Sequence, residues 1–299
     1  MNWSVRRIGQ RDYVTFDDIN KFYHFQTMTK ENGLLWLRAP SLVMKAKLDS
    51  LDLIINNVKF ILSYPVTEVG GQMLISRMDL CKMIDPILRP SYINSKQFTT
   101  IIVDPGHGGG DSGAKGAYGS EKDFTLLLAY QLRQELTKRG FQVVLTREKD
   151  EFVSLGERVR RANLIPNSIF VSLHFNSGES SVKGIETYAL SPQGTSSVYG
   201  TRETDFIEVT GNLRDSENIA LATAIHASVM HVIPTVDRGV KRARWHVLTG
   251  LEKPGVLFEG GFLTNQLECY SISSVAHRQN IALALVAAIV NYRNALKRR

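Results

Sequence analysis

The sequence has few cysteines and no long apolar run, and each absence excludes a class of protein. Only Cys81 and Cys269 occur among the 299 residues, and they form no CxxC pair. This excludes thiolate zinc knuckles and thioredoxin-like redox motifs. No stretch has the length of a transmembrane helix, so we expect no membrane insertion. The start, MNWSVRRIGQRDYVTF, has basic residues with no apolar run after them, so we expect no signal peptide in this chain.

Acidic residues are outnumbered by basic ones. The chain has 36 Lys and Arg against 29 Asp and Glu, which gives a formal net charge of +7. Such a charge favours anionic partners, such as nucleic acid, lipid headgroups or cell-surface polymers, although simple solubility explains it equally well. The basic residues are scattered and form no RNP-like or helix-turn-helix signature, so we expect no nucleic-acid partner.

The pattern of the chain changes near residues 89–97, which are polar and contain a proline. Before this stretch, short apolar runs alternate with turns. LDLIINNVKFILSYPV (51–66) predicts two strands around an Asn-Asn turn. MLISRMDLCKMIDPIL (73–88) predicts a strand that runs into a short helix stopping near Pro86. We therefore expect a small α+β accessory domain over residues 1–95.

After the boundary, strands and helices alternate. The expected strands are 98–104, 141–147, 168–176, 183–190 and 255–261, and the expected helices are 121–140, 154–165, 216–233 and 277–299. This alternation predicts an α/β fold, a mostly parallel twisted sheet with helices on both faces. We expect residues 96–299 to form this second, catalytic domain.

A glycine-rich loop, VDPGHGGGDSGAKGAYGSEKDF (103–124), follows the first expected strand. Its GGGDSG matches the dinucleotide-binding pattern GxGxxG, which is a weak signal. The following helix should open within the glycines, yet Gly116 and Gly119 delay it to Ser120. The next strand ends in Thr146-Arg147 instead of an acid, and no GK[ST] is present. A phosphate cradle therefore fits this loop poorly.

Three residues with side chains that can bind a metal are expected at the same edge of the sheet. His107 lies just past the carboxyl end of the first strand, where open α/β sheets bind ligands. Glu121 begins the next helix, and taken alone, a capping box in SEKD explains it. In SIFVSLHFN, His174 and Asn176 share one strand face near the carboxyl end. Two histidines and one glutamate leave an open position on tetrahedral zinc, as catalytic sites do.

Glu259 adds a carboxylate to the same crevice. It follows three apolar residues in GVLFEGGF, and charge in an apolar strand is costly. Desolvation would raise its pKa, which suits a general base and acid beside a metal-bound water.

Seven blocks together resemble the zinc-dependent N-acetylmuramoyl-L-alanine amidases. They are IIVDPGHGGGDSGAKG, EKDF, LTRE, LGERVRRAN, SLHFNS, KGIETYAL and GVLFEGGFLTN, and they keep the order of the family. The resemblance covers about residues 99–297. It implies hydrolysis of the amide that joins the lactyl group of N-acetylmuramic acid to the L-alanine of the stem peptide in peptidoglycan. The substrate implies a periplasmic or extracellular location.

The same resemblance implies roles for individual residues. One Zn²⁺ ion is held by His107, Glu121 and His174, with Glu259 as the catalytic carboxylate. Asn176 either binds substrate or caps its strand. For Arg147, a structural ion pair is favoured over contact with a stem-peptide carboxylate.

In some members of the family, a helix inserted after the second histidine blocks the zinc. The corresponding segment 190–215 has no amphipathic pattern here, so we expect no such plug, although the segment could act as a lid. The sequence names no activating protein partner.

The first 90 residues resemble the accessory domain named after the N-terminal domain of copper amine oxidases. YVTFDDINKFYHF (13–25), the INN turn and GGQMLISRMDL carry this likeness. It implies an accessory or wall-associated role and no copper site, because His24 is the only histidine there.

Two other functions stay open. One is a non-catalytic peptidoglycan-binding protein on an amidase-like fold, against which the presence of Glu259 and all three ligands counts. The other is a zinc peptidase that cuts within the stem peptide. Its chemistry is the same, and only the family motifs favour the amidase.

Overall fold

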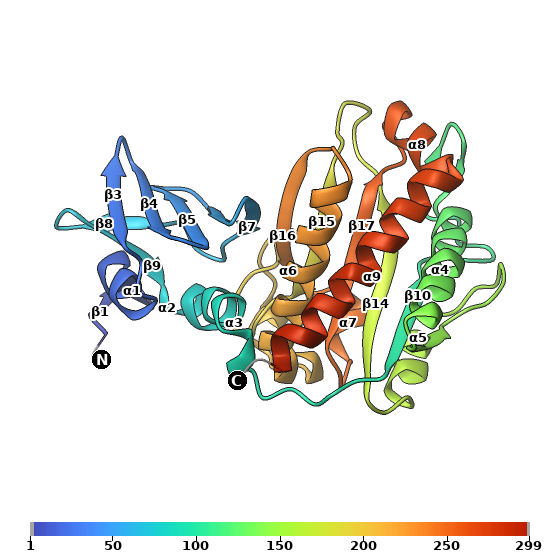
Figure 1. Cartoon of the computed structure of the whole chain (residues 1–299), viewed down its shortest axis with the longest axis horizontal. Helices are drawn as coiled ribbons and strands as arrows, with labels where there is room; N and C mark the ends of the chain where they lie inside the picture. The colour runs from blue at the N-terminus through green and yellow to red at the C-terminus, as the bar shows by residue number, and fades with distance from the viewer. Residues whose placement is uncertain (1–2, 298–299) are drawn as a thin grey trace.

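The computed structural model describes residues 3–297, and a large mixed sheet runs through the molecule (Figure 1). Within these residues the sheet has eleven strands in the order β13-β10-β14-β17-β15-β16-β7-β6-β5-β4-β3. The strands from the C-terminal part of the chain are β10 (Thr100–Pro105), β13 (Gln142–Leu145), β14 (Ser168–Asn176), β15 (Ile185–Leu190), β16 (Asp237–Ala243) and β17 (Gly255–Phe262). The pairs among β13, β10, β14 and β17 are parallel, whereas β15 runs antiparallel to β17 and parallel to β16. The predicted α/β class is confirmed.

Helices cover both faces of this part of the sheet. One face packs against α4 (Glu121–Lys138), α6 (Asp215–Val232) and α9 (Val275–Lys297), and the other against α5 (Leu155–Asn163) and α7 (His246–Thr249). Figure 1 shows α4, α6 and α9 lying across the near face. Successive residues of β10 alternate between the two cores, with Ile101 in the first and Ile102 in the second. This two-sided burial explains why its sequence is an unbroken apolar run.

The N-terminal part is rich in β-strands. Its elements are β1 (Val5–Ile8), β2 (Arg11–Thr15), α1 (Phe16–Phe22), β3 (Thr27–Glu31), β4 (Leu34–Ala39), β5 (Leu42–Lys47), β6 (Asp52–Ile55), β7 (Val58–Ile61), β8 (Thr67–Val69) and β9 (Gln72–Ser76). Strands β1, β2, β9 and β8 form a separate sheet, while β3–β7 form an antiparallel meander. Asn56 and Asn57 turn between β6 and β7 with φ of 48° and 65°, so the predicted Asn-Asn turn is confirmed.

The helical stretch after β9 continues past its proline. It comprises α2 (Arg77–Asp79), the π-helical η1 (Leu80–Ile84) and α3 (Asp85–Leu88). The sequence predicted a stop near Pro86, but the helix ends only at Leu88. The π turn resets the hydrogen-bond register, so that Pro86 lies in the first turn of α3, where its missing N–H has no required partner.

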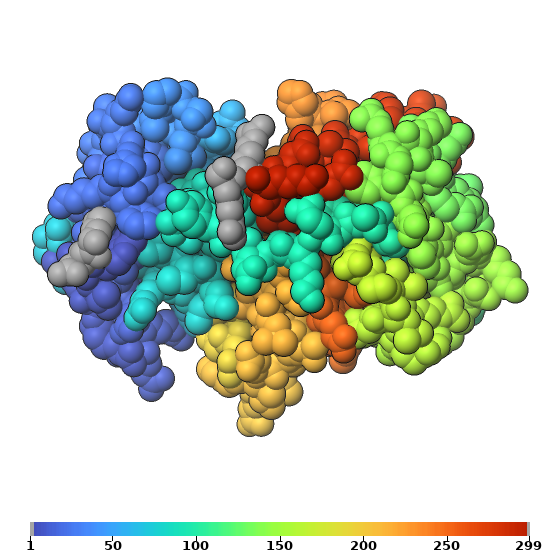
Figure 2. Space-filling view, turned by 60° about the horizontal axis from the view of Figure 1, so that its bottom comes forward, coloured from blue at the N-terminus to red at the C-terminus, as the bar shows by residue number. Residues whose placement is uncertain are grey.

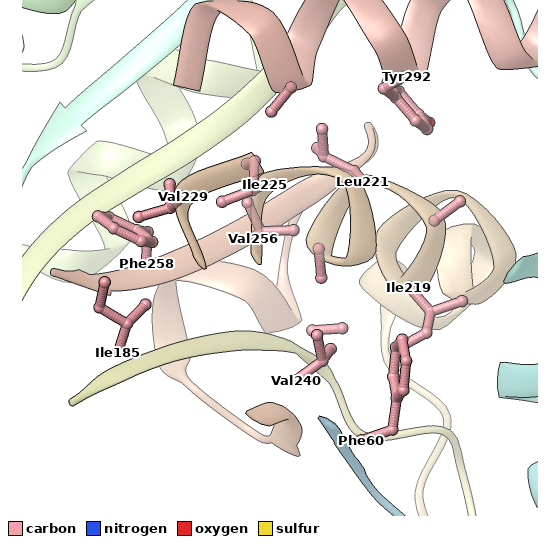
Figure 3. Packing of buried hydrophobic residues seen from close by; sticks show 14 of the residues in the cluster. Phe60, Ile185, Ile219, Leu221, Ile225, Val229, Val240, Val256, Phe258 and Tyr292 are labelled. Carbon is pink, nitrogen blue, oxygen red and sulfur yellow. The ribbon is translucent and has the colours of Figure 1, made fainter. Parts of the chain in front are cut away.

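The meander joins the C-terminal half of the sheet through both hydrogen bonds and packing. Strand β7 pairs with β16 at Phe60 and Val240. Figure 3 shows Phe60 beside Ile219 of α6 and Val240, in the core that continues to Phe258. The N-terminal strands therefore extend the central sheet.

A buried ion pair reinforces this junction. The guanidinium of Arg242 on β16 pairs with Asp79 of α2, and both side chains are almost fully buried. Arg242 Nη2 also donates to Ser63 Oγ at 2.6 Å. Tyr64 OH donates to the carbonyl oxygen of Gly194 at 2.9 Å, so the N-terminal part also reaches the segment after β15.

The segment between the two parts includes η2 (Pro90–Tyr92), and the predicted boundary between residues 95 and 96 falls in it. Figure 2 shows this segment, in teal, lying against the end of the red α9. Phe98 stacks on Tyr292 with ring centroids 5.8 Å apart, which fixes the segment to the core.

No single helix within residues 3–297 is long and apolar enough to cross a membrane. The pair α8 (Gln266–Ser273) and α9 reaches that length and composition only together, with a bend of 81° between them.

Candidate active site

The glycine loop after β10 makes room for side chains of the site. A Cβ on Gly106 would lie 2.3 Å from Cε1 of His174. A Cβ on Gly113 would lie 2.5 Å from Glu121 Oε2 and 2.6 Å from His107 Cδ2. Gly113 also has a φ of +63°, which favours glycine. At these two positions the glycines make room for two imidazoles and a carboxylate, so this part of the loop serves the side chains of the site.

His107, Glu121 and His174 meet as the sequence predicted. Glu121 Oε2 lies 3.0 Å from His107 Nε2, and Glu121 Oε1 lies 2.8 Å from His174 Nδ1. One ligand atom from each residue lies within 4.8 Å of the other two, so the group can hold a metal ion. The backbone N–H groups of Ala114 and Phe175 also donate to Glu121, at 2.8 and 3.2 Å. The carboxylate thus faces the imidazoles, and the Ser120 side chain makes no capping bond to the helix backbone.

Asp111 orients the His107 ring. Its Oδ2 lies 2.8 Å from His107 Nδ1, and its Oδ1 accepts from the N–H of Gly113 at 3.0 Å. A carboxylate on the second ring nitrogen is the usual support of a metal-binding histidine. Burial lowers the pKa of His107, but Glu121 and Asp111 outweigh burial and raise it. Burial raises the pKa of Glu121, but hydrogen bonds from the two histidines outweigh burial and hold it well below its usual range.

Two buried arginines hold the loop backbone. Arg158 donates to the carbonyls of Pro105 and His107 at 2.7 and 2.6 Å, and Arg147 donates to those of Pro105 and Gly106 at 3.0 and 2.9 Å. Arg147 is only 1% exposed, so it does not reach substrate. Its role is structural, but the predicted ion pair is wrong. Its guanidinium binds backbone carbonyls, and no acidic side chain lies within ion-pair distance among residues 3–297.

Glu259 lies on β17 between two other site strands. It is aligned with His174 of the parallel β14 and with Glu186 of the antiparallel β15. Its carboxylate is buried, and Oε2 has no hydrogen-bond partner among the described residues. Burial raises the pKa of Glu259 well above its usual value, the charges of Glu121 and Glu186 raise it further, and Lys241 opposes them. This agrees with the expectation drawn from its apolar strand.

Glu186 belongs to the site, and the sequence interpretation missed it. Its Oε1 accepts from Lys241 Nζ and Arg238 Nε, both at 2.6 Å, and its Oε2 accepts from Asn176 Nδ2 at 3.2 Å and from Tyr188 OH. Burial raises the pKa of this carboxyl, but Lys241, Tyr188 and Arg238 outweigh burial and lower it. The signal was present in KGIETYAL, where a charge interrupts an apolar strand as it does at Glu259.

The segment after β15 forms two short 3-10 turns, η3 (Glu203–Phe206) and η4 (Thr210–Arg214). Residues 191–214 contain no α-helix, as predicted. Tyr199 OH lies 2.7 Å from Tyr188 OH, which brings the segment beside the Glu186 network. The His107 and His174 side chains keep about a fifth of their surface exposed, at 23% and 17%.

Two imidazoles and a carboxylate that can hold a metal ion thus lie beside a buried, unpaired carboxyl group, a combination of side chains that suits hydrolysis. Comparisons with known proteins define the family. The N-acetylmuramoyl-L-alanine amidase family matches residues 101–291, and the chain belongs to it. The resemblance stated from the motifs and the predicted class of enzyme, a peptidoglycan-hydrolysing amidase, are thereby confirmed.

Individual relatives cover different shares of the chain. The amidase AmiA of Escherichia coli is 30% identical over 253 residues, which are 76% of this chain and 87% of AmiA. The amidase LytC of Bacillus subtilis is 32% identical over 193 residues, and the match spans only 35% of LytC. Among solved structures, the catalytic domain of the amidase CwlV from Bacillus (Paenibacillus) polymyxa is 29% identical with a TM-score of 0.55, and covers 66% of this chain and 99% of its own. The amidase AmiC2 of Nostoc punctiforme is 30% identical with a TM-score of 0.55, and covers 67% and 98%.

Proposed function

We propose that this chain is a zinc-dependent amidase in which Glu259 moves the proton and His107, Glu121 and His174 hold one Zn²⁺ ion. The observation that carries the proposal is the unpaired, buried Oε2 of Glu259 on the strand next to His174. A buried carboxyl oxygen without a partner costs stability, so a catalytic role explains why it is kept.

The donor set fits zinc. Imidazole nitrogen and carboxylate oxygen are ligands that zinc accepts, and three protein ligands are the number found in catalytic sites. Asp111 on the far nitrogen of His107 supports that histidine as a ligand. When bound, zinc would polarise the amide carbonyl and lower the pKa of a nearby water toward about 7.

Glu259 in its carboxylate form would accept a proton from the attacking water. The hydroxide adds to the lactyl carbonyl carbon, the C–N bond breaks, and Glu259 returns the proton to the leaving nitrogen of L-alanine. The products are a lactyl carboxylate and a stem peptide with a free amine. The raised pKa of Glu259 makes it a stronger base than an ordinary carboxylate, so it can take the proton from water, and the protonated group can then give it to the leaving nitrogen.

We extend the proposal to substrate and place. The substrate is the amide between N-acetylmuramic acid and L-alanine, with Asn176 as a contact, because its half-buried side chain borders Glu186 beside the site. Such a substrate puts the protein in the periplasm or outside the cell. We propose that residues 1–95 form an accessory domain, which the separate four-stranded sheet supports.

The test is digestion of purified peptidoglycan by the zinc-loaded protein, with product analysis by mass spectrometry. Intact stem peptides that begin with L-alanine support the amidase, and Glu259→Gln should release almost none. Cuts inside the stem would identify a peptidase instead. Binding to peptidoglycan with no release by the zinc-loaded wild type would identify a non-catalytic binding protein.

A further inference from the structure

Beside Glu259 lies a cationic pair that the hydrolytic reaction does not use. Arg238 Nε and Lys241 Nζ both bind the same oxygen of Glu186, each at 2.6 Å. Two positively charged side chains thus share one carboxylate oxygen. Positive side chains grouped in this way attract an anionic group of a ligand.

The guanidinium of Arg238 is held in place with its outer edge free. Its Nε is bound to Glu186, and its Cζ lies 5.1 Å above the ring of Phe262. No partner of Nη1 or Nη2 is found among the described residues, and the side chain is 34% exposed. An arginine fixed at Nε presents its two outer nitrogens as a fork, which matches the two oxygens of a carboxylate.

Gly184 lies against both the backbone and the arginine of the next strand. A Cβ at Gly184 would lie 2.4 Å from the carbonyl oxygen of Val236, 2.8 Å from Cγ and 2.9 Å from Cδ of Arg238, and the glycine has a φ of +121°. The close approach of the two backbones requires glycine here, and the same absence of a side chain leaves room for the stem of Arg238.

The distance from the reacting carboxyl group sets which carboxylate the fork can reach. Glu186 and Glu259 are cross-strand partners, whose Cβ atoms lie about 5 Å apart. Arg238 lies one hydrogen bond beyond Glu186. Consecutive Cα atoms of a peptide are about 3.8 Å apart, so a chain that starts at the scissile nitrogen reaches the fork within one or two residues.

We propose that Arg238 is a specificity-determining residue that binds the free α-carboxylate of the acidic residue after L-alanine in the stem peptide. That residue is linked onward through its side chain, so its α-carboxylate is available. The inference rests on the proposed function, and it adds a preference for substrates in which this carboxylate is free over those in which it is an amide.

The experiment compares two soluble substrates, N-acetylmuramoyl-L-alanyl-D-glutamate with the α-carboxylate free and the same compound with an α-amide. We expect the wild type to cleave the carboxylate form with a kcat/KM about tenfold to a hundredfold higher, mostly through KM. Arg238→Gln should remove this preference, and Arg238→Lys should restore part of it. Arg133→Gln is the matched control, because Arg133 is a surface arginine on α4 paired with Glu148.

Binding separates this inference from the proposed function. Calorimetry with the dipeptide L-alanyl-D-glutamate and its α-amide measures affinity without turnover, in the wild type and in both Arg238 variants. Weaker binding of the amide by the wild type, and no difference in Arg238→Gln, supports the role of Arg238 even if nothing is cleaved. Equal binding and equal cleavage of both forms by the wild type would overturn the inference and leave the amidase intact.

Discussion

Gly113→Ala should separate the space required by the metal ligands from ordinary backbone strain. With a φ of +63°, Gly113 has a conformation that costs an alanine about 1–2 kcal/mol. Its Cβ would lie 2.5 Å from Glu121 Oε2, whereas ordinary contact begins at 3.4 Å. The carboxylate would have to shift by about 0.9 Å, which is far more than the ~0.2 Å that metal–ligand distances tolerate.

Gly140→Ala is the matched control for this change. Gly140 has a φ of +79°, and a Cβ there meets nothing within 4 Å. Urea unfolding without zinc should show a loss of about 1–2 kcal/mol in Gly140→Ala, and a larger loss in Gly113→Ala because its Cβ also displaces Glu121. Competition with a zinc chelator should show wild-type affinity in Gly140→Ala and at least a tenfold loss in Gly113→Ala, as perturbed support of ligands gives. Equal zinc affinity in the two variants would refute the idea that the loop glycines make room for the ligands.

Buried charges at Glu259, Asp79 and Asp104 give four further predictions. Glu259→Gln should lower kcat by about 10²–10⁴ with zinc still bound, measured by turnover and metal analysis. The raised pKa of Glu259 means that its contribution to stability is present at low pH and lost as the pH rises through the folded-state pKa. Zinc-free Glu259→Gln should therefore gain stability over the wild type toward alkaline pH, and no such gain would contradict the raised pKa. Asp79→Asn leaves Arg242 buried without its ion pair and should lower the free energy of unfolding in urea by about 3–5 kcal/mol. A loss below about 1 kcal/mol would contradict this role of the ion pair. Burial raises the pKa of Asp104, but Arg158 and hydroxyl donors outweigh burial and lower it. The stabilisation by Asp104 is therefore present above an unfolded-state pKa of about 3.9 and is lost as the pH falls through the folded-state pKa. The free energy of unfolding should fall more steeply with decreasing pH in the wild type than in Asp104→Asn. Equal slopes would show that Asp104 does not contribute to acid unfolding.

The sequence predicted the site because chemistry and strand direction agreed there. His107, Glu121, His174 and Glu259 could be placed at one sheet edge from the parallel order of their strands and from strand alternation. The structure brings the first three together, and β17 places Glu259 next to β14. These positions depend on local pattern and on a common topology, which a single sequence carries.

Other features depend on contacts that local pattern does not encode. The sequence interpretation assigned no element to 234–254, where β16 carries Arg238, Lys241 and Arg242. This strand has charges along both faces, because one side meets Glu186 and the other meets Asp79 across the junction. Its apolar period is therefore weak, and only the tertiary partners make it a strand.

Hydrolysis of peptidoglycan in water labelled with oxygen-18, followed by mass spectrometry of both products, tests the central claim most directly. The account predicts one labelled oxygen in the lactyl carboxylate of N-acetylmuramic acid and an unlabelled stem peptide that begins with L-alanine, with release slowed at least about a hundredfold in Glu259→Gln. Label in a carboxylate of the stem peptide, or release by Glu259→Gln at the wild-type rate, would contradict it.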